Sequence, residues 1–268
     1  MYLDFNNFIF TYNIMDKKPK LNIKEVENEK KIVLSKFDFS CDDIDESIPK
    51  PLPQTLNFFM LISGKPASGK TSLILNLIAK NNKCYNKKFD KIYIFSPSLT
   101  TIKNSPFDDI PEDQIFQELS VETLLQAQTD IANTGEKVLF ILDDVVNDMK
   151  LKGVQVELTK MLMNRRHLAG AGGSTAFILT SQVYNKIPAP IRKTATQVVL
   201  YSTKNKAEIE NIFMELILIP RNDFYEILKY CFDKKHNFIY IDVNKPHDKM
   251  FHKCFTELSF STENESGL

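Results

Sequence analysis

One short segment constrains this chain more than any other. Residues 64–71 read GKPASGKT, which matches GxxxxGK followed by Ser or Thr. An apolar run at 57–62 precedes the segment and a helical pattern at 70–80 follows it. A chance Gly/Lys turn would not carry a strand and a helix on the required sides. The sequence therefore predicts a P-loop, whose backbone N–H groups and helix N-terminus bind the phosphates of a nucleoside triphosphate.

The P-loop supplies most of the expected ATP contacts. The residues expected to bind the nucleotide lie in the loop and at the start of its helix: Gly64, Lys65, Pro66, Ala67, Ser68, Gly69, Lys70, Thr71 and Ser72. Among them, Lys70 is expected to reach the β- and γ-phosphates and to be catalytic. The Thr71 hydroxyl is expected to ligate Mg²⁺.

A second element is a run of five apolar residues, 138–142, that leads into Asp143 and Asp144. Such a run is typical of a fully buried parallel strand, whose carboxyl end opens onto the ligand crevice of an α/β sheet. We interpret Asp143 as the partner of Mg²⁺ and Asp144 as the group that polarises the attacking water. The alternative is that the two carboxylates only cap the next loop.

A third strand, 175–180, ends in the polar sequence Thr180-Ser181-Gln182. If this strand lies between the P-loop strand and the acidic strand, its tip faces the γ-phosphate. Gln182 would then orient water or sense the phosphate. Taken alone, the same three residues are an ordinary transition from a strand to a loop.

Three arginines are candidates for stabilising charge on the transferred phosphoryl group. Arg165 and Arg166 end the helix that precedes the third strand, and we expect this helix end to approach the open edge of the nucleotide site. Either arginine could instead complement the negative end of its own helix. Three roles are open for Arg192: an arginine finger that stabilises the transferred phosphoryl group, a contact with DNA, or a surface ion pair.

Apolar runs alternate with helical patterns from residue 54 onward, which predicts an α/β fold with a mainly parallel sheet and helices on both faces. The expected strands are 57–62, 91–95, 138–142, 175–180, 197–201 and 237–242. The expected helices are 70–80, 121–133, 154–168, 207–217 and 222–231.

The expected organisation is an N-terminal extension and proline-rich linker at 1–53, followed by an ATPase domain at 54–268. A charged start at Met15 suggests that residues 1–14 are an upstream addition, and we expect them to be dispensable for ATP hydrolysis. No apolar stretch is long enough to span a membrane. The four dispersed cysteines favour a reducing, intracellular compartment.

Thirty-four basic and thirty-four acidic residues balance each other. The whole molecule therefore has no net charge that would gather nucleic acid, so a DNA site must be local or must arise on oligomerisation.

The chain resembles the DNA-packaging ATPases of poxviruses, giant viruses and virophages. The resemblance is carried by five segments in this order and spacing: GKPASGKTS, VLFILDDV, NRRH, FILTSQ and IPAPIRK. These ATPases belong to the FtsK/HerA superfamily of P-loop NTPases. The resemblance covers about 57–201 well and the last quarter loosely. It implies the additional-strand type of P-loop fold, with the Gln182 strand between the P-loop strand and the Asp143 strand.

The resemblance also implies a function. It implies a ring-shaped homo-oligomer that uses Mg²⁺-dependent ATP hydrolysis to drive double-stranded DNA into a capsid, in contact with capsid or portal-vertex proteins and no membrane. It implies a location in the host cytoplasm, at the virus factory, or with the virion. It gives Arg165 or Arg166 the role of an arginine finger that acts on the nucleotide of a neighbouring subunit.

This chain departs from the family pattern at Asp144, where much of the superfamily has Glu. Asp is one methylene shorter, so the attacking water must sit closer or another group must help.

Two other functions stay open on the sequence. A P-loop nucleoside or nucleotide kinase would need an acceptor pocket and often an arginine-rich lid, whereas the segment after Gln182 carries only Arg192. A nucleotide-dependent interaction protein would bind ATP without turnover, and the presence of both Asp144 and Gln182 argues against it.

Overall fold

The structure is a computed structural model, and it describes residues 43–79, 84–97, 107 and 109–260. The chain divides into two compact units, Met1–Phe37 and Asp38–Leu268, and every described residue belongs to the second. The predicted extension at 1–14 and most of the predicted linker lie outside the described residues. Among the described helices, none is long and apolar enough to cross a membrane.

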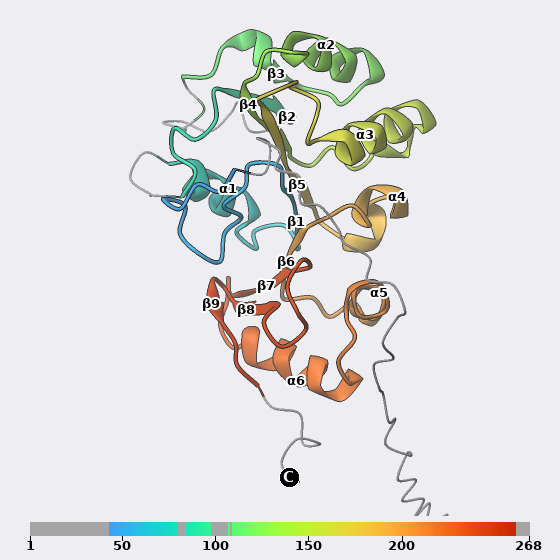
Figure 1. Cartoon of the computed structure of the whole chain (residues 1–268). Coiled ribbons are helices and arrows are strands. Elements are labelled where there is room, and N and C mark those ends of the chain that lie inside the picture. The colour runs from blue at the N-terminus through green and yellow to red at the C-terminus, as the bar shows by residue number, and fades with distance from the viewer. Residues whose placement is uncertain (1–42, 80–83, 98–106, 108, 261–268) are drawn as a thin grey trace, which may run out of the picture. The chain divides into compact units, whose positions relative to one another are not determined.

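The described strands form one sheet in the order β3-β2-β4-β5-β1-β6-β7-β8-β9 (Figure 1). Neighbouring strands are parallel from β3 to β6 and antiparallel from β6 to β9. Their bounds are β1 Phe59–Ser63, β2 Lys91–Phe95, β3 Ile115–Phe116, β4 Lys137–Leu142, β5 Ser174–Ser181, β6 Gln197–Tyr201, β7 Phe238–Asp242, β8 Phe251–Lys253 and β9 Thr256–Glu257. The expected α/β fold is confirmed, and β5 lies between β1 and β4 as the additional-strand type requires.

The central strands are apolar along their whole length because both faces of the sheet are covered. Every residue of β1, β5 and β6 is buried. Side chains alternate between two cores, so that Phe59 and Leu61 belong to one and Met60 and Ile62 to the other. In the first core, Tyr93, Phe140 and Phe177 stack side by side across β2, β4 and β5, with ring centroids 5.2 and 4.9 Å apart.

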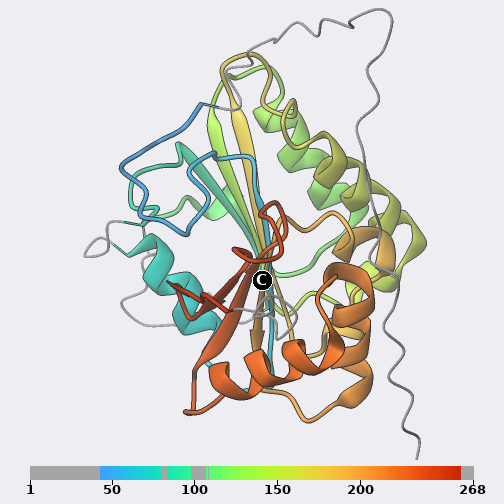
Figure 2. The same ribbon diagram turned by 60° about the horizontal axis from the view of Figure 1, so that its bottom comes forward.

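Helices cover the two faces unequally, as Figure 2 shows. The first core receives apolar residues of α2 to α6, whereas the second receives those of α1. The helices are α1 Lys70–Ile78, α2 Val121–Ile131, α3 Lys152–Asn164, α4 Ala189–Arg192, α5 Lys206–Leu216 and α6 Arg221–Cys231. A short helical turn follows β4 at Asp148–Lys150.

The sequence predicted the six longer strands and five of these helices, most of their ends within two residues. Helix α3 ends at Asn164 rather than 168, because the chain turns through 165–169 to reach Gly170 and Gly172, both with positive φ. The short elements β3, β8, β9 and α4 were not predicted, because two to four residues are too few to show a periodic pattern.

The end of the predicted linker packs against the domain. Ile48 is fully buried and Leu52 is 4% exposed, and both belong to the core that α1 covers. The Tyr85 hydroxyl donates to the Pro53 carbonyl, and the Tyr240 hydroxyl donates to the Pro51 carbonyl. The acidic and proline-rich composition suggested a segment outside the core, yet the apolar residues within it are enough to fix it in place.

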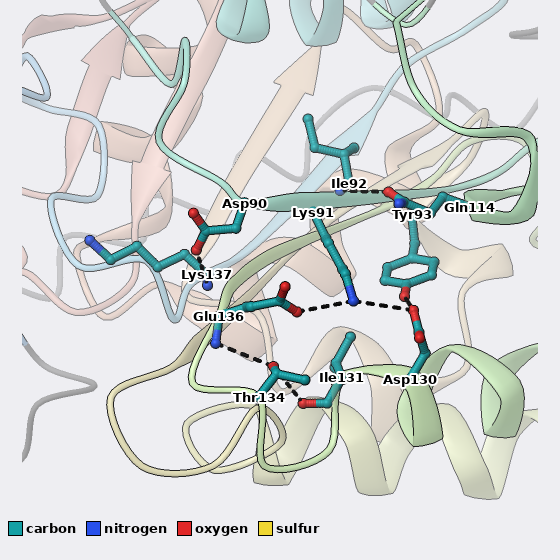
Figure 3. Close-up of polar contacts among 10 residues, drawn as sticks. All are labelled: Asp90, Lys91, Ile92, Tyr93, Gln114, Asp130, Ile131, Thr134, Glu136 and Lys137. Carbon is teal, nitrogen blue, oxygen red and sulfur yellow. Dashed lines mark hydrogen bonds and ion pairs between the residues drawn. The ribbon is translucent and has the colours of Figure 1, made fainter.

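A polar cluster ties α2 to the amino-terminal edge of the sheet (Figure 3). The Lys91 ammonium lies 3.1 Å from a Glu136 carboxylate oxygen and 3.5 Å from one of Asp130. The Tyr93 hydroxyl donates to the same Asp130 carboxylate. Lys91 and Lys137 are the first residues of β2 and β4, so the cluster lies at the opposite end of the strands from the P-loop.

Candidate functional site

The P-loop connects the end of β1 to the start of α1 and is held by its neighbours. The Gly64 N–H donates to the Ser181 carbonyl at the end of β5, at 3.0 Å. A Cβ on Gly64 would lie 2.7 Å from Ser68 Oγ and 2.7 Å from Tyr201 Cβ, so a side chain has no room there. Gly69 has φ of 110°, a conformation that L side chains rarely adopt. Both motif glycines are therefore required by the geometry of the loop.

The Lys70 side chain lies across the loop. Its ammonium donates to the Gly64 carbonyl at 2.6 Å and to the Lys65 carbonyl at 3.1 Å. Burial lowers the pKa of Lys70, while the nearby carboxylates of Asp143 and Asp144 act in the opposite direction. The two carboxylates are therefore near enough to act on the charge of Lys70, as expected if the P-loop and the acidic pair form one site.

Asp143 follows β4 and is only 4% exposed. Its Oδ1 accepts a hydrogen bond from the Thr180 hydroxyl at 2.6 Å. Burial raises the pKa of Asp143 above its usual range, and the charge of Asp144 acts in the same direction, while hydrogen bonds from Thr180 and Ser96 lower it. A buried carboxylate with a raised pKa is an unfavourable feature for folding, which is typical of a functional group.

Asp144 and Gln182 meet at the tips of β4 and β5. The Gln182 amide nitrogen donates to the Asp144 carboxylate, 3.2 Å from Oδ1. Asp144 has φ of 58°, and its N–H donates to Thr180 Oγ1 at 3.2 Å. A left-handed non-glycine residue is a local strain that the surrounding structure maintains, and such residues concentrate at functional sites.

Sequence reasoning did not single out Thr180, although its hydroxyl contacts both aspartates. It donates to the carboxylate of Asp143 and accepts from the backbone N–H of Asp144, so one side chain holds the first carboxylate and the main chain of the second aspartate. Thr180 belongs to the polar sequence at the end of β5, which was visible in the sequence. The role of Thr180 could be recognised only once β5 was known to lie beside β4.

The oxygen donors at this site fit a magnesium ion. Thr71 is the second residue of α1 and follows Lys70, which is coupled to Asp143 and Asp144. A carboxylate and a hydroxyl are the hard ligands that Mg²⁺ prefers, and Mg²⁺ sites use one or two carboxylates together with phosphates and water. An Mg²⁺ ion would also offset the cost of burying the Asp143 charge.

A buried carboxylate, Glu208, joins the ends of three strands behind the P-loop. Its Oε1 accepts from the Ser63 hydroxyl at 3.0 Å and from the Tyr184 N–H at 2.6 Å. Its Oε2 accepts from the Thr203 hydroxyl at 2.8 Å. Glu208 is 3% exposed and was not predicted, because its partners Ser63 and Tyr184 are distant from it in the sequence.

We expect Glu208→Ala to lower the free energy of unfolding by about 3 kcal/mol or more, because it leaves three donors without their acceptor in the interior. Glu208→Gln is the matched control, since its amide oxygen can still accept from Ser63 and Tyr184. Urea unfolding of the two variants checks this. Equal stability of Glu208→Ala and the wild type would show that the three bonds contribute nothing.

The structure corrects the expected position of the helix that carries Arg165 and Arg166. We expected its end to approach the open edge of the nucleotide site, and this was wrong. The Arg165 Nε donates to the Asn57 carbonyl at 2.6 Å, just before β1 begins. Because α3 runs antiparallel to the strands, its end lies at the amino-terminal edge, roughly 20 Å along β1 from the P-loop of the same chain.

The contacts of Arg165 fit the helix-end alternative. Its Nη1 donates to the Leu162 carbonyl in the last turn of α3, at 2.8 Å. Burial lowers the pKa of Arg165, and the charge of Arg166 acts in the same direction. The Arg166 side chain is exposed.

Arg192 forms an internal ion pair. Its guanidinium makes a bidentate contact with Glu215, with nitrogen–oxygen distances of 2.8 and 2.5 Å. It also donates to the Ile187 carbonyl at 2.8 Å and lies 5.5 Å from the centre of the Tyr184 ring. Of the three readings of Arg192, the structure therefore shows an ion pair, which fixes α4 against α5.

Several solved structures of similar fold come from viral proteins. The genome packaging NTPase B204 of Sulfolobus turreted icosahedral virus 2, solved with sulfate, has a TM-score of 0.53 and 14% identity, over 76% of this chain and 98% of that chain. Its complex with ATP-gammaS has a TM-score of 0.50 and 17% identity, over 76% and 99%. B204, the DNA-packaging ATPase of Sulfolobus turreted icosahedral virus, has a TM-score of 0.53 and 16% identity, over 76% and 98%. At these identities the likeness concerns the fold.

Among curated proteins, none matches this chain. A family model described as the poxvirus A32 protein matches residues 52–245, which is well over half of the chain. The matched region includes the P-loop, the acidic pair and the Gln182 strand. This chain therefore belongs to the poxvirus A32 protein family.

Proposed function

We propose that this chain is the ATP-driven motor that moves double-stranded DNA into a viral capsid. The observation that carries the proposal is the meeting of the motifs at the ends of β1, β4 and β5, where the Gly64 N–H donates to the Ser181 carbonyl and the Gln182 amide donates to Asp144. Membership of the poxvirus A32 protein family and the packaging role stated for B204 support the DNA substrate.

We assign the residues of the site as follows. Backbone N–H groups of the P-loop bind the phosphates, and Lys70 stabilises the charge that develops on the γ-phosphate. Thr71 and Asp143 would hold Mg²⁺, which would neutralise part of the phosphate charge. Asp144 accepts a proton from water, and Gln182, already within hydrogen-bonding distance of Asp144, orients that water. Gln182 is thus the additional group that the shorter Asp side chain needs.

The proposed active form is a ring-like homo-oligomer that contacts capsid or portal-vertex proteins, in the host cytoplasm. Because a single subunit has no net charge to attract DNA, the DNA site of this form is either a local patch or a surface built on assembly. Particle size measured with an ATP analogue and duplex DNA tests this. Growth from monomer to a defined oligomer supports the ring, and a monomer insensitive to both contradicts it.

In such a ring, we propose that Arg165 or Arg166 supplies positive charge to the nucleotide of a neighbouring subunit, because the arginines lie far from the P-loop of their own chain. Arg166→Ala tests the exposed member of the pair. Arg165 is only half-exposed and donates hydrogen bonds to two main-chain carbonyls, so its removal would also disturb the packing of α3.

We expect Arg166→Ala to bind ATP normally but to lose most of its turnover. An excess of Lys70→Ala subunits should then restore part of the activity, because these subunits still carry Arg166 and can offer it to an intact P-loop. A mixed assembly without any recovery would count against Arg166 as the trans-acting residue.

The test of the proposed function is ATP hydrolysis measured with and without double-stranded DNA. The motor is expected to release phosphate and to be stimulated by DNA. A parallel assay with nucleosides and nucleotides as acceptors addresses the kinase alternative, and ATP binding without phosphate release addresses the interaction protein. Transfer of phosphate to an acceptor in place of water would contradict the proposal.

A further inference from the structure

The two sides of the P-loop differ in chemistry, and the sheet order determines how. On the β5 and β4 side of β1 lie the tips that carry Gln182, Asp143 and Asp144. On the other side β1 is paired with β6, and β6 with β7. If the γ-phosphate faces Asp144 and Gln182, the β6 and β7 side of the P-loop is available to the α-phosphate and the nucleoside.

A hollow of about 370 Å³ lies on that side. One wall is the P-loop from Lys65 to Ser68, the floor includes Tyr201 and Ser202 at the end of β6, and the opposite wall is the loop 232–237 between α6 and β7. A volume of this size falls in the range of small-molecule sites. The side chain of Ser202 is exposed, whereas Tyr201 is buried.

The α6–β7 loop, residues 232–237, is cross-linked into a fixed shape. Asp233 lies 2.8 Å from the Lys253 ammonium of β8 and accepts from the Asn237 amide at 2.8 Å. The Asn237 N–H donates to the Lys234 carbonyl at 3.2 Å. The wall of the hollow is thus preorganised, which lowers the entropic cost of binding a ligand against it.

The same loop contacts the P-loop directly. His236 has φ of 70°, and its Nδ1 lies 3.0 Å from the Ser68 carbonyl oxygen. Because a carbonyl only accepts, Nδ1 carries the hydrogen. The Ser68 hydroxyl is buried and has no hydrogen-bond partner among the described residues.

We propose that the base and ribose of the nucleotide bind in this hollow, between the P-loop and the α6–β7 loop. Lys234 and Lys235 add positive charge at its rim, where the α-phosphate and ribose would pass. The inference rests on the proposed function, since it assumes that the P-loop binds a triphosphate. It goes further in fixing the direction of the nucleotide and in assigning recognition of the nucleoside to a loop outside every motif of the sequence.

Binding of two probes to the full chain separates the nucleoside from the phosphates. MgATP occupies the P-loop and the hollow, whereas Mg-tripolyphosphate occupies the P-loop alone. We expect Ser202→Trp, which fills the hollow, to raise the Kd for MgATP about tenfold or more and to leave the Kd for Mg-tripolyphosphate within about twofold. Ser259→Trp is the matched control, because Ser259 is exposed beside β9 and lines a different hollow.

Lys70→Ala should weaken the binding of both probes, since it removes a contact with the phosphates. If Ser202→Trp raised the Kd of both probes equally, or of neither, the hollow would not hold the nucleoside. If wild-type protein bound neither probe, the proposed function itself would fail.

Photolabelling gives an independent check on the wild-type chain. We expect 8-azido-ATP to label the α6–β7 loop or the end of β6. Excess ATP should prevent the labelling, and excess tripolyphosphate should prevent it less efficiently. Labelling confined to other segments, in protein that hydrolyses ATP, would overturn this inference and leave the proposed function intact.

Discussion

Lys70→Ala is expected to lower ATP turnover by about a hundredfold or more, which is the usual effect of removing a preorganised electrostatic group. The ammonium of Lys70 lies within the P-loop, where it contacts the carbonyls of Gly64 and Lys65 and is coupled to Asp143 and Asp144. No water molecule can replace a fixed positive charge aimed at the transferred phosphate. Steady-state release of phosphate at saturating ATP measures the loss.

Lys160→Ala is the matched control, because Lys160 lies on α3 with a largely exposed side chain. It should hydrolyse ATP at the wild-type rate. A melting curve of each variant separates lost chemistry from lost folding. Turnover by Lys70→Ala within a fewfold of the wild type would contradict the assignment of the site.

Substitutions of the two neighbouring aspartates are expected to impair ATP hydrolysis in different ways. Asp144→Asn should bind ATP and Mg²⁺ but hydrolyse about a hundredfold more slowly, because an amide cannot accept the proton of the attacking water. Asp143→Asn should require far more Mg²⁺, because it removes the buried carboxylate of the proposed ion site. Mg²⁺ titration of the ATPase rate distinguishes them. Rescue of Asp144→Asn rather than Asp143→Asn by Mg²⁺ would reverse the two roles.

Asp143→Asn is also expected to stabilise the protein without nucleotide at neutral pH. The folded protein raises the pKa of Asp143, chiefly by burial, so folding disfavours its charged form. The destabilisation is therefore present above the folded pKa and disappears below the unfolded value of about 3.9. The Asn side chain can still accept from Thr180. Melting temperatures should be higher for the variant at pH 7 and should converge with the wild type as the pH falls toward 4.

The elements of the fold were predictable because each of the longer ones carries its own pattern. The apolar run of β4 and the helical spacing of α1 are visible in any window of the sequence. The P-loop residues were predictable for the same reason, since they are adjacent in the chain. Even the meeting of Asp144 and Gln182 could be expected, once β5 was placed beside β4 through the family resemblance.

What the sequence could not show are contacts between distant segments. Arg165 reaches Asn57, and Arg192 reaches Glu215. Each partner is one of many carboxylates or carbonyls in the chain, and only the packing of helices on the sheet selects it. The edge of the sheet at which Arg165 lies could have been inferred, because a helix that leads into a parallel strand ends at the amino-terminal edge, but its partner Asn57 could not.

His236 illustrates the same limit at the site itself. It follows two lysines in a loop with no motif, and its contact with Ser68 depends on β6 lying beside β1 and β7 beside β6. Residues that surround the nucleotide outside the P-loop come from the carboxyl edge of several strands, so the order of the strands has to be known first.

Movement along duplex DNA is the central claim, and displacement of a third strand from a DNA triplex measures it most directly. A subunit ring that translocates on the duplex strips off the third strand, whereas an enzyme that only hydrolyses ATP leaves it bound. We expect the wild-type chain to release the third strand in the presence of ATP and Mg²⁺, and Lys70→Ala to release none. DNA-stimulated ATP hydrolysis by an assembled oligomer with the triplex still intact would contradict the motor.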